Sequence, residues 1–477
     1  MDRRSLTQLV ALLGLMVLTL AACGQKPGVS EQTGPVGALA DLDGDGIADT
    51  GVDADGDGIA DLGTGTSDGT TLAEGGGSGS SGGPTDSGGG DDTGDGPQGP
   101  AGGGPAPSGG DTTGVTGNSI KIGLHAPITG AAPVPQASFE KGKDLYFEWL
   151  KRNHQSINGR GVTVVSKNDN YNPSQAVAVC QEMVEQDKVF LLFGLAGTDQ
   201  IQACARYAES VGVPYLSAGV TEIGLTSLRT YFALWMSYKQ QGPLIADMVV
   251  DKLGGRGKVN GMVRFQTPNF QDAHDSWVSA MGSKGARVTY DRAVPKTAGA
   301  SDAQTVATEL RQRGVDIVYI LSSPSWFIQL ANAAAQQGYK PQWVGAGITK
   351  ALDTVANVAC KNQGSIDNAR FLHPAPAYAD SDKFDPDFRK AGGTDDIMWG
   401  LWAGSKATAA LLRRPGKDLS RERFVYFSER ASSIKTGVLP TLSFSPTDHF
   451  GGSQMHLLRA ECSDNRFVTE QAFVNNF

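Results

Sequence analysis

A cysteine that follows a short apolar run can be modified covalently, and this chain has one near its start. Arg3 and Arg4 precede an apolar run of about 17 residues that ends in Leu20-Ala-Ala-Cys23. This is the layout of a bacterial lipoprotein signal, and it is shorter than the about 20 residues of a membrane span. We therefore predict a signal peptide over residues 1–22 and lipid such as palmitate on Cys23. The alternative is an ordinary secretory signal, in which Cys23 is incidental.

The other four cysteines form an even set in an exported chain, which favours disulfides. Four cysteines allow three pairings. Cys180 and Cys204 lie on early predicted helices and Cys360 and Cys462 lie late, so we expect Cys180 to pair with Cys204 and Cys360 with Cys462. There is no CxxC spacing and the six histidines are scattered, so the sequence predicts no zinc site.

Alternating carboxylates occur twice in a row near the start of the chain, in a pattern that suits calcium. Hard oxygen ligands wrap the cation, and a following glycine permits the sharp turn. The pattern resembles the DxDxDG repeats of EF-hand-like and thrombospondin type 3 segments, but Val52 stands where the last acidic ligand is expected. We expect either weak calcium binding or a solubilising acidic linker. The candidate ligands are Asp41, Asp43, Asp45, Asp49, Asp53, Asp55, Asp57 and Asp61.

These repeats at 41–61 lie in a segment of unusual composition, which we assign to residues 23–117. It has no aromatic residue, no Lys or Arg after Lys26, and about half of the chain's 63 glycines. Such a segment cannot bury enough apolar surface to offset the entropy of ordering, so we predict a flexible tether. About 93 residues of this type give an r.m.s. reach of roughly 50–60 Å. The net charge of −9 owes much to it and gives no sign of nucleic-acid binding.

From about residue 118 the pattern changes to strands that alternate with helices, which predicts βαβ units and parallel sheets. Some 360 residues exceed one usual core, so we expect two α/β lobes. The predicted strands are 120–124, 162–166, 189–193, 214–217, 259–263, 287–290, 317–321 and 342–344. The predicted helices are 137–153, 173–186, 198–211, 240–253, 269–283, 303–313 and 326–337.

Several motifs in this part resemble one family. The opening Ile120-Lys-Ile-Gly-Leu-His-Ala-Pro-Ile-Thr-Gly130 is similar to that of mature leucine/isoleucine/valine-binding proteins, the type I periplasmic solute-binding proteins of branched-chain amino-acid ABC transporters. Each motif alone is weak, but they are collinear over about three-quarters of the chain. The further motifs are Asn158-Gly-Arg-Gly161, Asn168-Asp-Asn-Tyr-Asn-Pro173, Gly212-Val-Pro-Tyr-Leu-Ser217, Gln241-Gly242, Asp316-Ile-Val-Tyr319 and Gly338-Tyr-Lys-Pro-Gln-Trp-Val-Gly345.

The resemblance implies two Rossmann-like lobes that are joined by a three-segment hinge and close on a ligand. It places lobe I at 118–237 and 371–438, and lobe II at 238–370 and 439–477. Parallel sheets bind ligands at the carboxyl ends of their strands, beside helix N-termini that favour anions. The resemblance assigns ligand contacts to Thr198, Gly219, Thr221 and Phe270. Gly197, in the loop that enters the Thr198 helix, and Trp326, which begins a helix of the second lobe, are further candidates. Two alternatives remain: Thr198 or Asp199 only caps a helix, and Trp326 only packs on its own sheet.

Two departures bear on the ligand. Ala346-Gly347 stands where amino-acid binders carry an acid for the α-ammonium group, and Pro135 stands where a tyrosine is expected. An ammonium group removed from water needs a charge partner. We therefore expect leucine, isoleucine and valine to bind weakly. The ligand need not be an α-amino acid, since an amide, an aromatic acid or another small polar solute also fits these residues.

The sequence favours a monomeric, lipid-anchored solute-binding protein on the outer face of the cell membrane that delivers its ligand to an ABC permease. The main alternative is a receptor that reports ligand to a membrane signalling protein, and a third is a structural lipoprotein. An enzyme is disfavoured. Gly254-Gly-Arg-Gly-Lys258 lacks the spacing of a phosphate loop, and neither G-x-S-x-G nor G-x-G-x-x-G is in place. No motif requires a cofactor, apart from weak calcium in the tether.

The anchoring prediction is testable with one substitution. Cys23→Ser should leave the protein unprocessed or release it into the medium, because the residue that would receive the lipid is absent. Membrane fractionation of cells that carry the variant measures this. A Cys23→Ser protein that is processed and still fractionates with the membrane would contradict lipidation.

Overall fold

The computed structural model describes residues 105–347 and 351–477. The predicted signal peptide, the lipidation site at Cys23, most of the tether and the acidic repeats at 41–61 lie outside the described residues. The described part contains two sheets with helices on both faces, and the predicted α/β class is confirmed.

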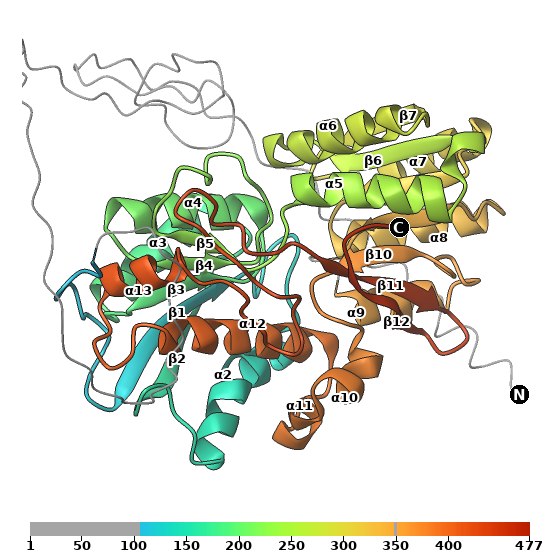
Figure 1. Cartoon of the computed structure of the whole chain (residues 1–477). Coiled ribbons are helices and arrows are strands. Elements are labelled where there is room, and N and C mark those ends of the chain that lie inside the picture. Colours follow the sequence, from blue (N-terminus) through green and yellow to red (C-terminus); the bar gives the residue numbers. More distant parts are fainter. Residues whose placement is uncertain (1–104, 348–350) are drawn as a thin grey trace, which may run out of the picture. The chain divides into compact units, whose positions relative to one another are not determined.

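The first sheet has five parallel strands in the order β2-β1-β3-β4-β5. Its central strands are buried on both faces, as a sheet covered by helices on each side requires. Helices α3 and α4 cover one face, and α2 and α12 cover the other (Figure 1). The strands are β1 Ser119–Ala126, β2 Gly161–Asn168, β3 Leu191–Gly194, β4 Tyr215–Ser217 and β5 Tyr231–Ala233. The helices are α2 Gln136–Arg152, α3 Pro173–Glu185, α4 Thr198–Ser210, α12 Asp396–Arg413 and α13 Arg421–Ser428.

The second sheet has seven strands in the order β12-β11-β10-β9-β8-β6-β7. Five are parallel, and β11 and β12 are antiparallel additions at one edge. Helices α5 and α6 pack on one face, and α7, α8 and α9 on the other (Figure 1). The strands are β6 Asn260–Phe265, β7 Val288–Val294, β8 Ile317–Leu321, β9 Gln342–Ala346, β10 Arg370–His373, β11 Met455–Glu461 and β12 Arg466–Val474. The helices are α5 Tyr238–Asp247, α6 Pro268–Ser283, α7 Ala300–Gln312, α8 Pro324–Gln336 and α9 Leu352–Ala359.

The chain passes between the two sheets three times: after β5, after β10 and before β11. Shorter helical segments follow β10, namely η3 Tyr378–Asp380, α10 Ser381–Phe384 and α11 Pro386–Ala391. Others follow α5, namely η1 Met248–Lys252 and η2 Gly255–Gly257. We call the elements around the first sheet the first lobe and those around the second sheet the second lobe.

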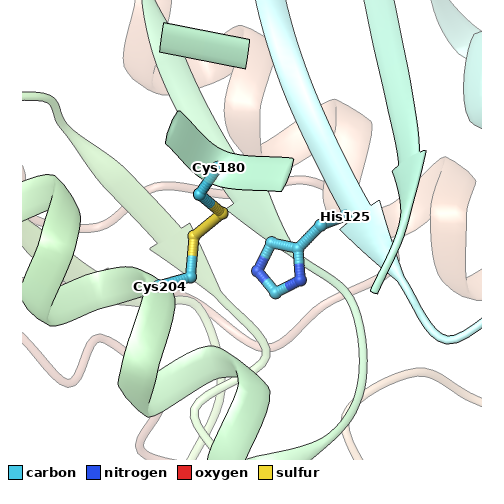
Figure 2. A group of neighbouring side chains, drawn as sticks. All are labelled: His125, Cys180 and Cys204. Atoms are coloured by element: carbon cyan, nitrogen blue, oxygen red, sulfur yellow. A yellow bond between two sulfur atoms is a disulfide. The ribbon is translucent and has the colours of Figure 1, made fainter. Parts of the chain in front are cut away.

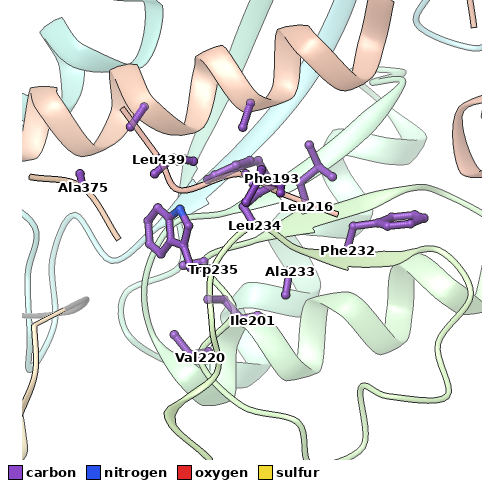
Figure 3. Close-up of a cluster of buried hydrophobic side chains, with 14 of the residues drawn as sticks. Phe193, Ile201, Leu216, Val220, Phe232, Ala233, Leu234, Trp235, Ala375 and Leu439 are labelled. Carbon is purple, nitrogen blue, oxygen red and sulfur yellow. The ribbon is translucent and has the colours of Figure 1, made fainter. Parts of the chain in front are cut away.

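Two expected segment bounds differ from the strand pairing. We placed the return to the first lobe at residue 371, but β10 pairs with β9 and β11 and so belongs to the second sheet. We assigned 439–477 wholly to the second lobe, but Phe450 pairs with Ala233 of β5. Figure 3 shows Leu439 among the buried side chains of Phe193 and Leu216. These two crossings therefore follow His373 and Gly452, because backbone pairing decides to which sheet a segment belongs.

The expected disulfides are both present, one between Cys180 and Cys204 and one between Cys360 and Cys462. The first joins α3 to α4. The second joins the end of α9 to the turn that links β11 and β12. Within residues 105–347 and 351–477, no helix has the length and apolar character needed to cross a bilayer.

Candidate ligand site

A cavity lies where the carboxyl ends of strands from both lobes meet. We call it the interlobe cavity; it holds about 1070 Å³ of space between atoms, counted out to its open side. The first-lobe wall includes Pro127, Ala132, Pro133, Val134, Pro135, Tyr171, Leu195, Ala196, Gly197, Thr198, Trp235, Asp396, Ile397 and Gly400. The other lining residues are Tyr238, Phe265, Phe270, Ser322, Ser323, Pro324, Ala351, His373, Pro374 and Ala375. Its lining of apolar and aromatic side chains with a few polar groups is typical of sites for small organic molecules.

The N-terminus of α4 forms one wall, as predicted. Gly197 is the N-cap and adopts φ +87°, and a Cβ there would collide with the Gln200 side chain. The first intrahelical bond runs from Ile201 N to Gly197 O, so the earlier amides of this helix have no intrahelical acceptor. Thr198 is the first helical residue and does not cap. The capping alternative therefore does not account for Thr198, and the helix end offers free donors and a positive dipole to an anion.

Asp199 follows Thr198, and its carboxylate joins the two lobes. Oδ1 accepts a hydrogen bond from Asn269 Nδ2 of α6, and Oδ2 contacts Lys296 Nζ, which follows β7. Burial lowers the pKa of Lys296. The second lobe thus supplies a cation and an amide donor to an acid that would otherwise repel a ligand carboxylate at the α4 N-terminus.

Aromatic side chains from both lobes provide the apolar surface of the cavity. Phe270 lines it, as expected, and packs edge to face on Tyr238 at 5.4 Å between ring centroids. Thr267 caps α6 by accepting a hydrogen bond from Asn269 N at 3.3 Å, and Pro268 follows, which fixes the start of the helix that carries Phe270. Tyr171 and Trp235 also line the cavity but were not predicted. Both follow the carboxyl ends of strands, which is the signal that could have found them.

Three expected contacts are absent from the described cavity wall. Trp326 is 2% exposed, donates from Nε1 to Gly299 O at 3.3 Å and packs on Phe265, so its alternative role in the core of the second lobe is the one observed. Gly219 and Thr221 lie one layer behind the wall. A Cβ at Gly219 would meet Trp235 O, and the carbonyl of Val220 accepts a hydrogen bond from Tyr238 N at 3.3 Å.

The cavity wall contains an acid that sequence reasoning missed. Asp396 begins α12, and its Oδ2 accepts a hydrogen bond from Asp353 N at 3.1 Å. Burial raises the pKa of Asp396 to about 7, and the nearby Asp353 carboxylate adds to the rise. His373 also lines the cavity, and burial lowers its pKa to about 4, so it is neutral at pH 7. Gly347, which stands where the resemblance places the acid of amino-acid binders, donates its amide to Leu372 O at 2.7 Å.

Similarity to known proteins agrees with this geometry. The family model described as periplasmic binding protein matches residues 119–466. The chain belongs to this family. A Leu/Ile/Val-binding protein homolog of Brucella abortus is 24% identical over 252 residues, which cover 50% of this chain and 65% of that protein. An amino acid binding protein of Pseudomonas aeruginosa is 27% identical over 207 residues, which cover 42% of this chain and 53% of that protein. Both matches span less than two thirds of the relative's length.

Solved structures of periplasmic binding proteins share the fold. A fatty acid ABC transporter substrate-binding protein of Thermomonospora curvata has TM-score 0.64 and 17% identity, covering 77% of this chain and 95% of that one. A Rhodopseudomonas palustris solute-binding protein in complex with 3,4-dihydroxybenzoic acid has TM-score 0.62 and 17% identity, covering 74% and 96%. A Streptococcus pneumoniae branched-chain amino acid substrate-binding protein in complex with isoleucine has TM-score 0.61 and 16% identity, covering 72% and 97%. The family and these proteins agree with a binding protein and not an enzyme.

The Asp199–Lys296 contact predicts how charge affects closure. Lys296→Ala should shift the lobes toward an open form, since it removes the cation that the second lobe presents to Asp199. Because Lys296 is 37% exposed, we expect a coupling of about 1 kcal/mol, or about fivefold in the equilibrium. The distance distribution between probes on α2 and α7 of the full chain measures it.

Two further variants control this experiment. The charge swap Asp199→Lys with Lys296→Asp should restore the closed form in part. Lys390→Ala removes a lysine that pairs with Asp387 within its own lobe at 3.0 Å and should change nothing. Equal opening by Lys296→Ala and Lys390→Ala would show that the interlobe pair is irrelevant to closure.

Proposed function

We propose that this protein is an extracytoplasmic solute-binding lipoprotein that captures a small solute in the interlobe cavity and delivers it to an ABC permease. The observation that carries the proposal is the cavity itself. Free amides at the α4 N-terminus and aromatic side chains converge there from lobes that three chain segments connect. A ligand that contacts both lobes stabilises the closed form by its differential affinity.

The chemistry of the wall indicates a solute with one carboxylate or amide and an apolar body. Among the described lining residues there is no Lys or Arg, so a carboxylate would be bound by neutral donors: the amides and the Thr198 hydroxyl of α4, with hydroxyl and indole groups such as those of Tyr171 and Trp235 elsewhere in the wall. The aromatic groups fit an apolar body. We propose ligand contacts for Gly197, Thr198 and Phe270, with the loop of Gly219 and Thr221 supporting Trp235 and Tyr238 from behind. An amino-acid-like solute, an amide or an aromatic acid fits this description, and the names of the relatives support the same range.

Anchoring and partners complete the proposal. Cys23 would carry the lipid, and the tether would hold the monomeric body off the membrane, with weak calcium binding at the acidic repeats. Where the described chain begins, it is fastened to α13: Arg423 Nη1 donates to Pro107 O at 2.9 Å, and Ser420 Oγ donates to Gly109 O at 2.9 Å. The alternative is a receptor in which the same closure signals to a membrane protein. A gene neighbourhood with a permease and an ATPase would favour transport.

A ligand screen tests the proposal directly. A thermal-shift panel of amino acids, amides and short-chain and aromatic acids should contain at least one carboxylate or amide that raises the unfolding midpoint of the full chain. A ligand at about 100 times its dissociation constant adds roughly 2.7 kcal/mol to stability. Thr198→Ala should weaken that ligand by about 1–3 kcal/mol, and the control Thr163→Ala, on an exposed part of β2, should not. Equal affinities in the two variants would remove Thr198 from the site.

The raised pKa of Asp396 predicts a pH dependence whose sign reports the charge of the ligand. Below about 7 the carboxyl is protonated, and above it the group is ionised. Affinity for leucine, which has an ammonium group, should rise with pH by up to tenfold per unit below this pKa. Affinity for 4-methylpentanoate, which lacks the amino group, should fall as pH rises.

Calorimetry at several pH values measures both trends. Asp396→Asn should abolish them, and Asp382→Asn, an exposed aspartate of the neighbouring α10, should preserve them. If the affinity of Asp396→Asn for either ligand still changes with pH, another group is responsible for the pH dependence.

A further inference from the structure

A fully buried histidine lies beneath the first-lobe wall of the interlobe cavity. His125, at the carboxyl end of β1, donates from Nδ1 to Asp169 Oδ2 at 2.8 Å. Its Nε2 accepts a hydrogen bond from the Tyr215 hydroxyl at 2.6 Å, and burial raises the pKa of that phenol well above its usual range. The side chains of His125 and Asp169 and the whole of Tyr215 are 0% exposed. We call these three residues the His125 network.

The His125 network is connected to three of the loops that line the cavity. Asp169 Oδ1 accepts a hydrogen bond from Tyr171 N at 3.0 Å. The His125 carbonyl accepts one from Leu195 N at 3.2 Å, and the Ala126 carbonyl accepts one from Asp169 N at 3.1 Å. Tyr171, Leu195 and Pro127, which follows Ala126, all line the cavity. The network therefore joins the loops after β1, β2 and β3.

The loop that carries Tyr171 needs such support because its backbone is strained. Asn170 and Tyr171 are consecutive non-glycine residues with φ of 56° and 54°, in the left-handed region that side chains disfavour. Such a conformation persists only when its surroundings hold it. Besides the Asp169 bond, Asn168 Oδ1 accepts hydrogen bonds from Asn170 N at 2.9 Å and Ile128 N at 2.9 Å.

The disulfide Cys180–Cys204 lies beside His125 (Figure 2). It joins α3 and α4, the helices that follow the Tyr171 loop and the Leu195–Thr198 loop. Among the described residues, His125, Cys180 and Cys204 bring potential metal-ligand atoms within 4.8 Å of one another. Both sulfurs are bonded to each other, and both imidazole nitrogens have hydrogen-bond partners, so the group is a structural one.

We propose that His125 is a positioning residue for the interlobe cavity. It does not line the cavity. Its side chain holds Asp169, which in turn holds Tyr171, and these bonds add to the main-chain bond between Leu195 and residue 125. An apolar residue would fill the end of a buried strand at lower desolvation cost, whereas a fully paired polar network specifies one loop geometry. The effect on affinity rests on the proposed function, and the effect on loop order does not.

The test compares variants of the full chain. Tyr215→Phe removes one hydroxyl and leaves His125 Nε2 unpaired, and His125→Gln replaces the ring. His449→Gln is the matched control: His449 is also a buried first-lobe histidine, 8% exposed, and its Nδ1 lies 2.9 Å from Tyr231 O. Hydrogen exchange by mass spectrometry reports peptides that cover 127–130 and 168–171. Calorimetry with isoleucine, benzoate and 4-hydroxybenzoate reports affinity.

We expect Tyr215→Phe and His125→Gln to speed exchange in both peptides and to weaken the probe that binds by about tenfold, the scale of one lost hydrogen bond. His449→Gln should lower the melting temperature without either effect. If Tyr215→Phe lowers only the melting temperature and leaves loop exchange unchanged, His125 is merely structural and the inference fails. If no probe binds the unaltered protein, the proposed ligand class fails, while exchange still decides the positioning role. If His125→Gln does not fold, Tyr215→Phe alone decides.

Discussion

The amides in the first turn of α4 have no acceptor within their own helix, and the arrangement of the site depends on this constraint. A parallel strand that leads into a helix places such amides at the carboxyl edge of the sheet. Because β10 and three chain crossings bring the second sheet opposite this edge, the donors face a shared cavity and not bulk solvent. Backbone geometry alone thus presents hydrogen-bond donors at this wall of the cavity.

The charge balance of the site is divided between the lobes. Asp199 lies in the same first turn of α4. The helix dipole stabilises its negative charge, but that charge would repel an anionic ligand. Lys296 and Asn269 from the second lobe occupy both of its carboxylate oxygens. The second lobe thereby partners the acid that lies beside the free amides of α4.

Local patterns allowed most of the fold to be predicted, and the exceptions have physical reasons. Alternating apolar runs and helical periodicity located the strands and helices, and the order of the cysteines along the chain suggested both disulfides. The lobe to which β10 belongs was not predictable, since four residues of strand give no sign of their partners and only pairing with β9 and β11 decides it. Trp326 was ambiguous because a tryptophan in the first turn of a helix suits a wall or a core equally; its bond to Gly299 O depends on tertiary packing.

The sequence located the candidate site residues that lie where one loop enters a helix. It missed the residue that a distant segment of the chain brings to the cavity. Gly197, Thr198 and Phe270 are each placed by the helix that they begin, so a motif is sufficient. Asp396 reaches the cavity because α12 packs against α2, about 260 residues earlier in the chain. Its carboxyl is close to half-ionised near neutral pH, since burial and Asp353 oppose the charge while the start of α12 favours it. The cavity wall therefore contains a buried acid from the first lobe, although none stands at Gly347 of the second.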